Sequence, residues 1–284
     1  MQNYQWKSAV IEAEQDKTTI DYRWLSAATT HVGAVREVNE DNQIEKPEIG
    51  LWVVADGMGG HSAGDVASGM VVDELSTVRR TGNNEEFIER VIEVLSITNQ
   101  KLRQLAFQKF DKQAVMGTTV VVLIIHENRF TILWAGDSRV YRYRNHTLQQ
   151  LTRDHSQVND MLDSGLLAED EVEDHPLANV ITRAIGASQT LNLDRIDGEI
   201  QHGDIFMLCS DGLNKELSDQ EISAFFSSGD VDEINKALIH SALVRGAQDN
   251  ITAISVRVEG TVANDQTIPA LSGQTGEEST INGY

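Results

Sequence analysis

The chain has 284 residues, with 23 Lys and Arg against 44 Asp and Glu, and a formal net charge of −21. This charge argues against a general nucleic-acid binder, which neutralises phosphates with Lys and Arg, and against a protein that docks on anionic lipid through a basic face. Apolar residues make up 40% of the sequence. That share is enough to form a buried core in one large domain or two small ones.

Cys209 is the single cysteine, so a disulfide framework is excluded. Its place in the apolar run 205–209 indicates a buried hydrophobic residue rather than a nucleophile. No stretch reaches the length of a membrane span, and the N-terminus lacks the apolar core of a signal peptide. We therefore expect a cytoplasmic protein that engages neither membrane nor nucleic acid.

Composition divides the chain into three parts. Residues 1–24 are polar and weakly patterned, and we assign them to an N-terminal extension. Residues 25–259 form the expected folded domain. Residues 260–284 are rich in Gly, Ser, Thr, Asn and Gln, which predicts a disordered C-terminal tail.

Strands and helices alternate along the expected domain. Apolar or alternating runs predict β-strands at 51–55, 119–125, 129–135, 140–144, 205–209 and 251–258. Residues 126–128 indicate a hairpin turn, so at least part of the sheet is antiparallel. Helical spacing of apolar residues predicts helices at 62–80, 85–107 and 232–244, the last ended by Gly246. This order favours an α/β protein whose sheet is not purely parallel.

Four aspartates lie at the ends of predicted strands. Asp56, Asp137 and Asp211 follow strands and adjoin a glycine, and Asp249 precedes the strand 251–258. Taken singly, each is more simply interpreted as a turn residue. If the strand ends lie side by side, however, four carboxylates converge and raise one another's pKa. A bound cation would relieve that repulsion, and oxygen ligands favour Mg²⁺, Mn²⁺ or Ca²⁺ over Zn²⁺.

Eight stretches of the sequence resemble, in order, the metal-dependent Ser/Thr protein phosphatases of the PP2C (PPM) type in their bacterial form. They are 32–42, 53–68, 116–122, 135–144, 151–156, 180–187, 209–213 and 248–252. The resemblance covers about residues 28–258. It implies an α+β fold, a four-layer αββα sandwich of two packed antiparallel β-sheets flanked by helices, with a small helical flap insertion at about 154–180.

The resemblance also implies a metal centre with two to three Mn²⁺ or Mg²⁺ ions as cofactors. Asp56 would bridge two ions, and the backbone carbonyl of Gly57 would bind the first of them. Asp211 and Asp249 would complete the second. Asp137, together with Asp211, matches a third and weaker metal site of bacterial members.

Further residues are assigned to catalysis by the same resemblance. Arg36 would grip the substrate phosphate, and Glu40 and Asp41 would lie beside the ions and hold their water. Where the animal enzymes have a His thought to protonate the leaving alkoxide, this chain has Met58, as bacterial relatives do. The acid is then a metal-bound water or another residue. His61 is a candidate, although a packing or hydrogen-bonding role for it is at least as well supported.

The activity implied is hydrolysis of phosphoserine and phosphothreonine in proteins by a metal-activated water, which reverses Ser/Thr kinase signalling. Its partners would be phosphoprotein substrates that include a Ser/Thr kinase, and the enzyme would act as a monomer. One alternative is a phosphatase dedicated to a single phosphorylated regulator, such as an anti-sigma antagonist. Another is a non-catalytic binding module, against which the presence of all four strand-end aspartates argues.

The densest acidic segment runs from Asp154 to Asp174 and contains eight carboxylates and no Lys or Arg. We expect a small helical insertion there. A solvated surface is its simplest interpretation. Our alternative hypothesis is that this segment disfavours acidic phosphopeptides and favours basic ones.

Overall fold

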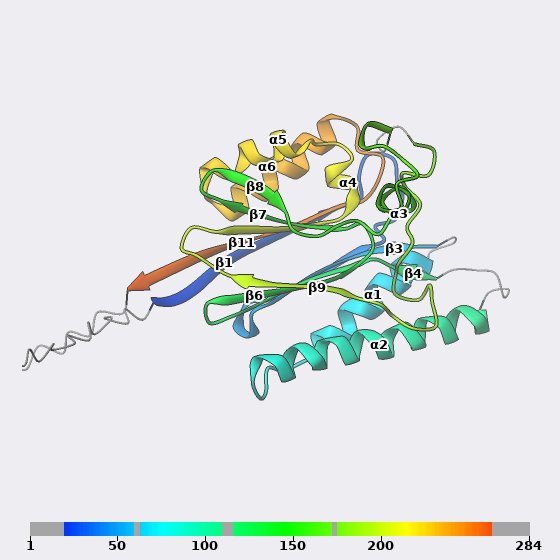
Figure 1. Cartoon of the computed structure of the whole chain (residues 1–284), viewed down its shortest axis with the longest axis horizontal. Coiled ribbons are helices and arrows are strands. Elements are labelled where there is room, and N and C mark those ends of the chain that lie inside the picture. The colour runs from blue at the N-terminus through cyan, green and yellow to red at the C-terminus, as the bar shows by residue number, and fades with distance from the viewer. Residues whose placement is uncertain (1–19, 60–62, 110–115, 172–174, 263–284) are drawn as a thin grey trace, which may run out of the picture. The chain divides into compact units, whose positions relative to one another are not determined.

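The computed structural model describes residues 20–59, 63–109, 116–171 and 175–262 (Figure 1). The chain divides into two units, one made of residues 22–260 and the other of residues 1–21 and 261–284. The strands and helices belong almost entirely to the first unit. Among the described helices, none combines the length and the apolar character needed to cross a lipid bilayer.

The first strand begins at Ile20 and the last ends at Val262, so regular structure extends beyond both predicted domain limits. Residues 1–19 of the predicted extension lie outside the described residues, and so do residues 263–284 of the predicted disordered tail. The domain limits at 25 and 259 therefore stay predictions.

Strands and helices follow one another along the described chain. The strands are β1 (Ile20–His31), β2 (Asp41–Lys46), β3 (Leu51–Met58), β4 (Gly117–Thr118), β5 (Val120–His126), β6 (Arg129–Ala135), β7 (Arg139–Arg144), β8 (Thr147–Gln150), β9 (Asp194–Glu199), β10 (Ile205–Cys209) and β11 (Ile251–Val262). The α-helices are α1 (Ala63–Ser76), α2 (Asn84–Lys109), α3 (Gln157–Asp163), α4 (Asp211–Asn214), α5 (Asp219–Phe225) and α6 (Val231–Val244). Single 3₁₀ turns occur at Pro47–Ile49, Glu169–Glu171 and Phe226–Ser228.

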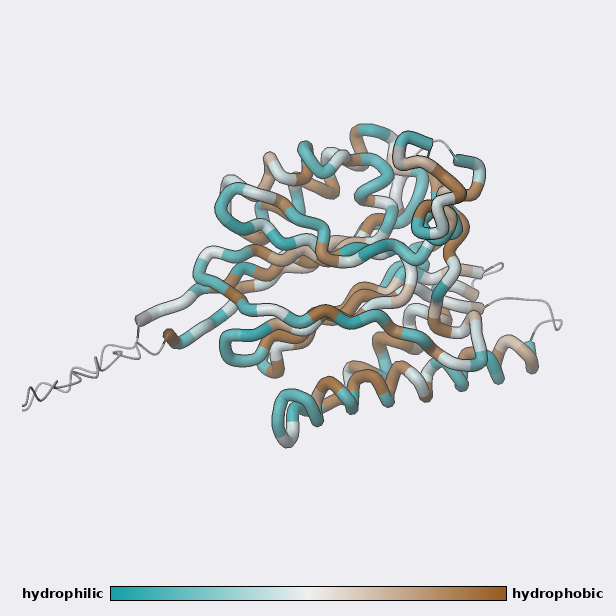
Figure 2. Tube along the Cα trace, viewed as in Figure 1, coloured by the Kyte–Doolittle hydropathy of each residue, from teal (hydrophilic) through white to brown (hydrophobic). Residues whose placement is uncertain are grey.

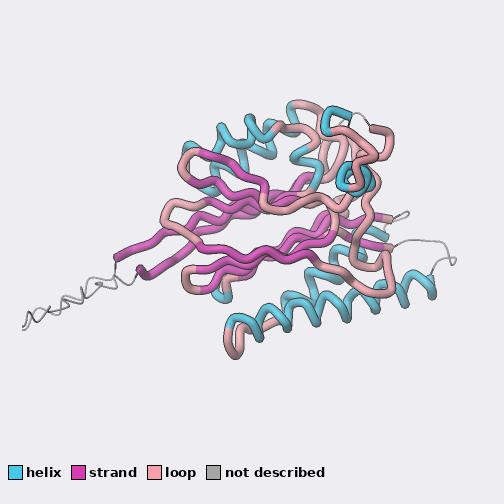
Figure 3. Tube along the Cα trace, in the orientation of Figure 1, coloured by secondary structure: helices cyan, strands magenta, loops and turns pink. Residues whose placement is uncertain are grey.

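The described strands form two sheets. One has the order β1-β11-β10-β7-β8, and the other has the order β2-β3-β5-β6-β9, with β4 paired to β3. The pairs of defined register are antiparallel. Figures 1 and 3 show the two sheets stacked between α1 and α2 on one side and α5 and α6 on the other. The predicted α+β, four-layer αββα sandwich is confirmed.

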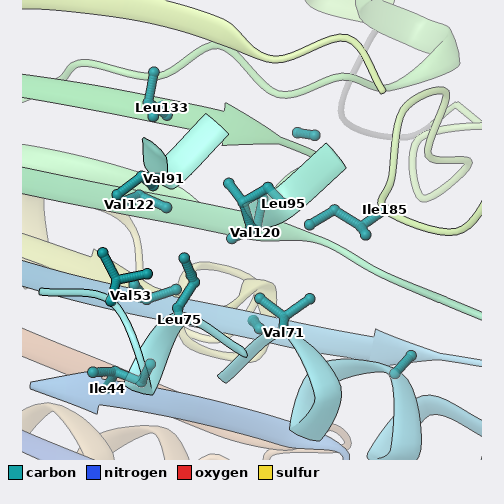
Figure 4. Packing of buried hydrophobic residues seen from close by; sticks show 14 of the residues in the cluster. Ile44, Val53, Val71, Leu75, Val91, Leu95, Val120, Val122, Leu133 and Ile185 are labelled. Atoms are coloured by element: carbon teal, nitrogen blue, oxygen red, sulfur yellow. The ribbon is translucent and has the colours of Figure 1, made fainter. Parts of the chain in front are cut away.

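The two-residue period of the strands generates three hydrophobic layers. Hydrophobic residues appear as brown stretches along the strands and helices in Figure 2. In β3, Val53 packs against α1 and α2, whereas its neighbours Trp52 and Val54 face the other sheet. Figure 4 shows the first of these layers, where Val71 of α1 and Leu95 of α2 meet residues of the sheet. In β10, Phe206 enters the layer between the sheets, and its neighbours on either side pack beneath the helices α5 and α6.

The sequence predicted the apolar strands well and missed the polar ones. The six predicted runs correspond to β3, β5, β6, β7, β10 and β11, and residues 126–128 form the β5–β6 hairpin connection. The strands β1, β2, β4, β8 and β9 were not predicted. β2 has Ile44 as its one buried apolar residue, and β9 alternates half-buried and exposed positions within the sequence DRIDGE.

The described residues of the predicted flap contain one short α-helix, α3, and the 3₁₀ turn Glu169–Glu171. Ser156 caps α3 by accepting a hydrogen bond from the Asn159 backbone N–H. The acidic residues 172–174 lie outside the described residues.

Candidate functional site

The candidate site lies at one end of the layer between the two sheets, where the alternation of β3 continues into a carboxylate. Trp52 and Val54 face the sheet that contains β10 and β11, and Asp56 is the next residue on that face of β3. The β2–β3 register pairs Asp56 with Asp41. Burial raises the pKa of Asp56 well above its ordinary value, and the charge of Asp41 raises it further.

Three more aspartates act on the same carboxyl group. Asp211, Asp137 and Asp249 each add to the rise in the pKa of Asp56 through their negative charge. The four strand-end aspartates predicted to converge therefore lie within electrostatic reach of one another. They do so because strands of both sheets end at the same edge of the sandwich.

Asp41 is held by two hydroxyl groups from the opposite sheet, one on the residue that follows β10 and one in β11. Its Oδ2 accepts hydrogen bonds of 2.7 Å from Ser210 Oγ and Thr252 Oγ1. Its Oδ1 is buried and accepts no hydrogen bond from the described residues. Burial, together with the negative charges of Asp211 and Asp249, raises the pKa of Asp41 to about 7, although the hydrogen bonds from the two hydroxyls lower it.

Asp137 and Asp211 form a second acidic pair. Both side chains are buried, and Oδ1 of each accepts no hydrogen bond from the described residues. Burial and the charge of Asp211 raise the pKa of Asp137 to about 7. Asp211 Oδ2 forms an ion pair with Lys215 Nζ, four residues further along. Burial lowers the pKa of Lys215, but the negative charges of Asp211 and Asp137 outweigh burial and raise the pKa above its ordinary value.

Arg36 and Asp249 form an ion pair at the exposed side of the site. Arg36 Nη2 lies 3.0 Å from both carboxylate oxygens of Asp249. Gly33 fixes the loop that carries Arg36, because its φ is +84° and an added Cβ would lie 2.1 Å from the Asp249 backbone oxygen. Asn250 closes the loop on the other side by accepting a hydrogen bond from the Glu40 backbone N–H and donating to the Val32 carbonyl.

Gly57 lies where β3 meets the start of α1. A Cβ at this position would lie 2.1 Å from the Gly64 backbone oxygen and 2.6 Å from that of Glu40. The Gly57 N–H donates to the Glu40 carbonyl, which also accepts from the Ser68 hydroxyl. Glycine is therefore required at this position by the close approach of three backbone segments.

His155 positions the loop that carries Asp137. The Gly136 backbone N–H donates to the ring atom His155 Nδ1 over 3.1 Å, and the His155 backbone N–H donates back to the Gly136 carbonyl over 2.9 Å. The other ring nitrogen lies 3.1 Å from Asp194 Oδ2, and the ring stacks on Trp134. Burial lowers the pKa of His155, which fits a neutral ring that accepts at Nδ1 and donates at Nε2.

A cleft of about 640 Å³ opens beside Asp137 and Asp211. Its other walls come from the flap, through residues such as Ser156, Asn159 and Asn179, and from α4 and the loop after it. The cleft thus joins the acidic pair to the segment that the sequence predicts to be an insertion.

The predicted residues divide into those that the fold brings together and those that it leaves apart or undescribed. Asp41 joins the cluster of strand-end aspartates, whereas Glu40 lies beside it mainly through its backbone contacts. His61 lies outside the described residues. Cys209 is fully buried with a pKa raised to about 12 by burial, which confirms the prediction that it is no nucleophile.

Sequence reasoning missed the residues that support the aspartates. Ser210 and Thr252 orient Asp41, Asn250 connects the loops, and Lys215 pairs with Asp211. Only Lys215 carried a signal in the sequence, because its four-residue spacing from Asp211 on a short helix predicts a contact.

The donor set fits divalent cations. Three buried carboxylate oxygens, one each from Asp41, Asp137 and Asp211, accept no hydrogen bond from the described residues, and such groups are costly unless a partner satisfies them. The described residues nevertheless contain no three His, Cys, Asp or Glu side chains already gathered as around a single ion. Arg36 and Lys215 each form an ion pair with one of the carboxylates, Asp249 and Asp211 respectively.

Comparison with known proteins identifies the family. A family model described as protein phosphatase 2C matches residues 37–239. The chain belongs to the protein phosphatase 2C family. It is 34% identical to the serine/threonine phosphatase stp of Listeria monocytogenes over 235 residues, which cover 80% of this chain and 93% of that relative.

Solved structures agree with this assignment. PppA of Pseudomonas aeruginosa, titled a key regulatory component of T6SS, is 42% identical with a TM-score of 0.77 over 84% of this chain and 100% of that one. The catalytic domain of the phosphatase PstP in complex with two manganese ions is 30% identical, with a TM-score of 0.73 and the same coverage. The predicted enzyme class, protein-serine/threonine phosphatase, is confirmed, and neither alternative function is supported.

The pKa values of the buried aspartates predict how stability depends on pH in the presence of a chelator. Between about pH 4 and pH 7 the Asp41 carboxyl keeps its proton in the folded protein, whereas it has lost that proton in the unfolded chain, where its pKa is 3.8. The free energy of unfolding contributed by Asp41 should therefore fall between about pH 4 and pH 7, by up to about 1.4 kcal/mol per pH unit.

Urea unfolding at pH 5, 6 and 7 of the wild type and of Asp41→Asn measures this contribution. The wild type should lose stability relative to the variant as the pH rises. A difference between the two proteins that does not change with pH would contradict the burial of a proton on Asp41.

Proposed function

We propose that this phosphatase uses two or three divalent cations, Mn²⁺ or Mg²⁺, at the cluster of strand-end aspartates to hydrolyse phosphoserine and phosphothreonine in proteins. The observation that carries the proposal is the set of buried carboxylate oxygens of Asp41, Asp137 and Asp211 that accept no hydrogen bond from the described residues. The manganese ions in the PstP structure support it, since that protein has a similar fold and 30% identity to this chain.

The residues that would hold the cations are Asp56, Asp211, Asp249 and Asp137, with the backbone carbonyl of Gly57. All are oxygen donors, which suit Mg²⁺ and Mn²⁺. When bound, divalent ions make a water nucleophilic near neutral pH and stabilise the attacking and leaving oxygens of an in-line displacement.

The chain's own residues would orient the reactants. Asp41, fixed by Ser210 and Thr252, offers its free Oδ1 as an acceptor for a water at the centre of the site. Arg36 has a half-exposed side chain whose partner, Asp249, is itself a proposed ligand. If Asp249 held a cation, the guanidinium fork of Arg36 would be available to two oxygens of the substrate phosphate.

Several features of the proposal go beyond the family assignment. The identity of the metal, a Ser/Thr kinase among the substrates, a monomeric state and a cytoplasmic location all stay predictions. The leaving-group acid is also open: Met58 cannot donate a proton, which leaves water or another residue such as His61.

Asp211→Asn tests the proposed centre. Hydrolysis of a phosphothreonine peptide by the wild type should require added Mn²⁺ or Mg²⁺ and stop with chelator. The variant should lose turnover by at least roughly 100-fold and bind Mn²⁺ more weakly, because it replaces a charged ligand by a neutral one. Asp232→Asn, at an exposed aspartate of α6, is the matched control and should retain activity. Activity that survives chelation, or an active Asp211→Asn enzyme, would remove the metal centre from the mechanism.

The charge of the cleft predicts which phosphopeptides are preferred. Arg139 is neutralised by a bidentate pair with Asp154, and Lys215 is paired with Asp211. Asp219, in the cleft wall, accepts a hydrogen bond from the Tyr141 hydroxyl and has no Lys or Arg partner among the described residues. We therefore expect the cleft to favour basic residues beside the phosphorylated one.

Matched phosphothreonine peptides with Arg or with Glu on the flanking positions test this preference. The basic peptide should have the higher kcat/KM, and Asp219→Asn should narrow the ratio by about threefold, the scale of one exposed charge pair. Asp232→Asn is again the control. Equal kcat/KM values for the two peptides would reject the electrostatic role of the cleft.

A further inference from the structure

Lys215 directly follows the short helix α4 and pairs with Asp211 at the start of that helix. Asp211 begins this helix and Lys215 follows its last residue, so the four-residue spacing brings the ammonium group onto Asp211 Oδ2. The Lys215 side chain is 37% exposed and lines the cleft, whereas the Asp211 side chain is 11% exposed. The ion pair thus lies at the boundary between the cleft and the buried site.

The two oxygens of Asp211 have different surroundings. Oδ2 is engaged by Lys215, while Oδ1 is buried and accepts no hydrogen bond from the described residues. Asp137, the partner of Asp211 in the acidic pair, likewise has a buried Oδ1 that accepts none. One oxygen of Asp211 is therefore left for a divalent ion, and the other already faces a positive charge.

No other cation among the described residues of the cleft can take the place of Lys215. Arg139, the other basic residue in the cleft wall, is committed to Asp154 through both of that residue's carboxylate oxygens and also donates to the Tyr141 hydroxyl. Asp154 adds a further negative charge near Asp137 and Asp211. The ammonium group of Lys215 is accordingly the one basic group in the described part of the cleft that contacts a member of the acidic pair, Asp211.

We propose that the ammonium group of Lys215 acts as a resident cation for the Asp137–Asp211 pair, so that this chain binds two divalent ions and excludes a third. The inference rests on the proposed function and specifies its metal stoichiometry. A third ion shared by Asp137 and Asp211 would lie close to the Lys215 ammonium group on Asp211 Oδ2, and it would have to displace that compact, strongly charged group or lie beside it. Both possibilities weaken its binding, and neither affects ions that use Asp211 Oδ1.

The test is Mn²⁺ bound per chain at saturation, measured by equilibrium dialysis and elemental analysis of the full-length protein. The wild type should saturate at two ions. K215M and K215Q should each saturate at three, because both remove the charge, and the second keeps a polar side chain in case the first impairs folding. Lys236 offers the matched control: it forms the other four-residue Lys–Asp pair of the described chain, with Asp232 on α6, and K236M should saturate at two.

Each outcome supports or overturns the role of Lys215. Three ions on the wild type, or the same non-zero number on the wild type, K215M and K215Q, would overturn that role and leave the proposed function intact. An absence of Mn²⁺ from the wild type and both variants would instead overturn the proposed function. A gain of one ion in the two Lys215 variants alone supports the inference, with circular dichroism confirming that all the proteins are folded.

Discussion

Repulsion among aspartates at one end of the sandwich is the constraint on which the site depends. Asp56 follows Trp52 and Val54 on the inter-sheet face of β3, so the same alternation that builds the core also carries a carboxylate to its edge. Asp41 lies directly across the strand pair. Burial of such charges is costly without compensation. The surrounding contacts, from the hydroxyls on Asp41 to the close approach at Gly57, fix these carboxylates where they cannot move apart.

The protein compensates part of this charge itself. Arg36 pairs with Asp249 at the exposed side, and Lys215 pairs with Asp211 at the cleft. Asp41 and Asp137 have no such partner among the described residues. Burial and the charges of neighbouring aspartates raise their pKa values to about 7. Under the proposed function, the net charge of −21 is no obstacle to binding a phosphate dianion, because the aspartates at the site would face cations rather than substrate.

Much of the fold and the outline of the site could be predicted from the sequence. Apolar strands such as β5 are visible because each of their faces is buried, whereas β2 and β9 bury too few apolar residues to give a signal. The four strand-end aspartates could be named, but their convergence depends on the order of strands in two sheets, which spacing does not encode. The supporting contacts were invisible for the same reason: the Thr252 hydroxyl meets Asp41 across 211 residues of chain.

The most direct test of the aspartate centre is proton release on Mn²⁺ binding, measured by calorimetry near pH 6.5 in buffers of different ionisation enthalpy. Because burial raises the pKa values of Asp41 and Asp137 to about 7 and raises that of Asp56 as well, binding should release at least about one proton per chain. Mn²⁺ binding without proton release at pH 6.5 would contradict the claim that buried, cation-deficient aspartates form the centre of the site.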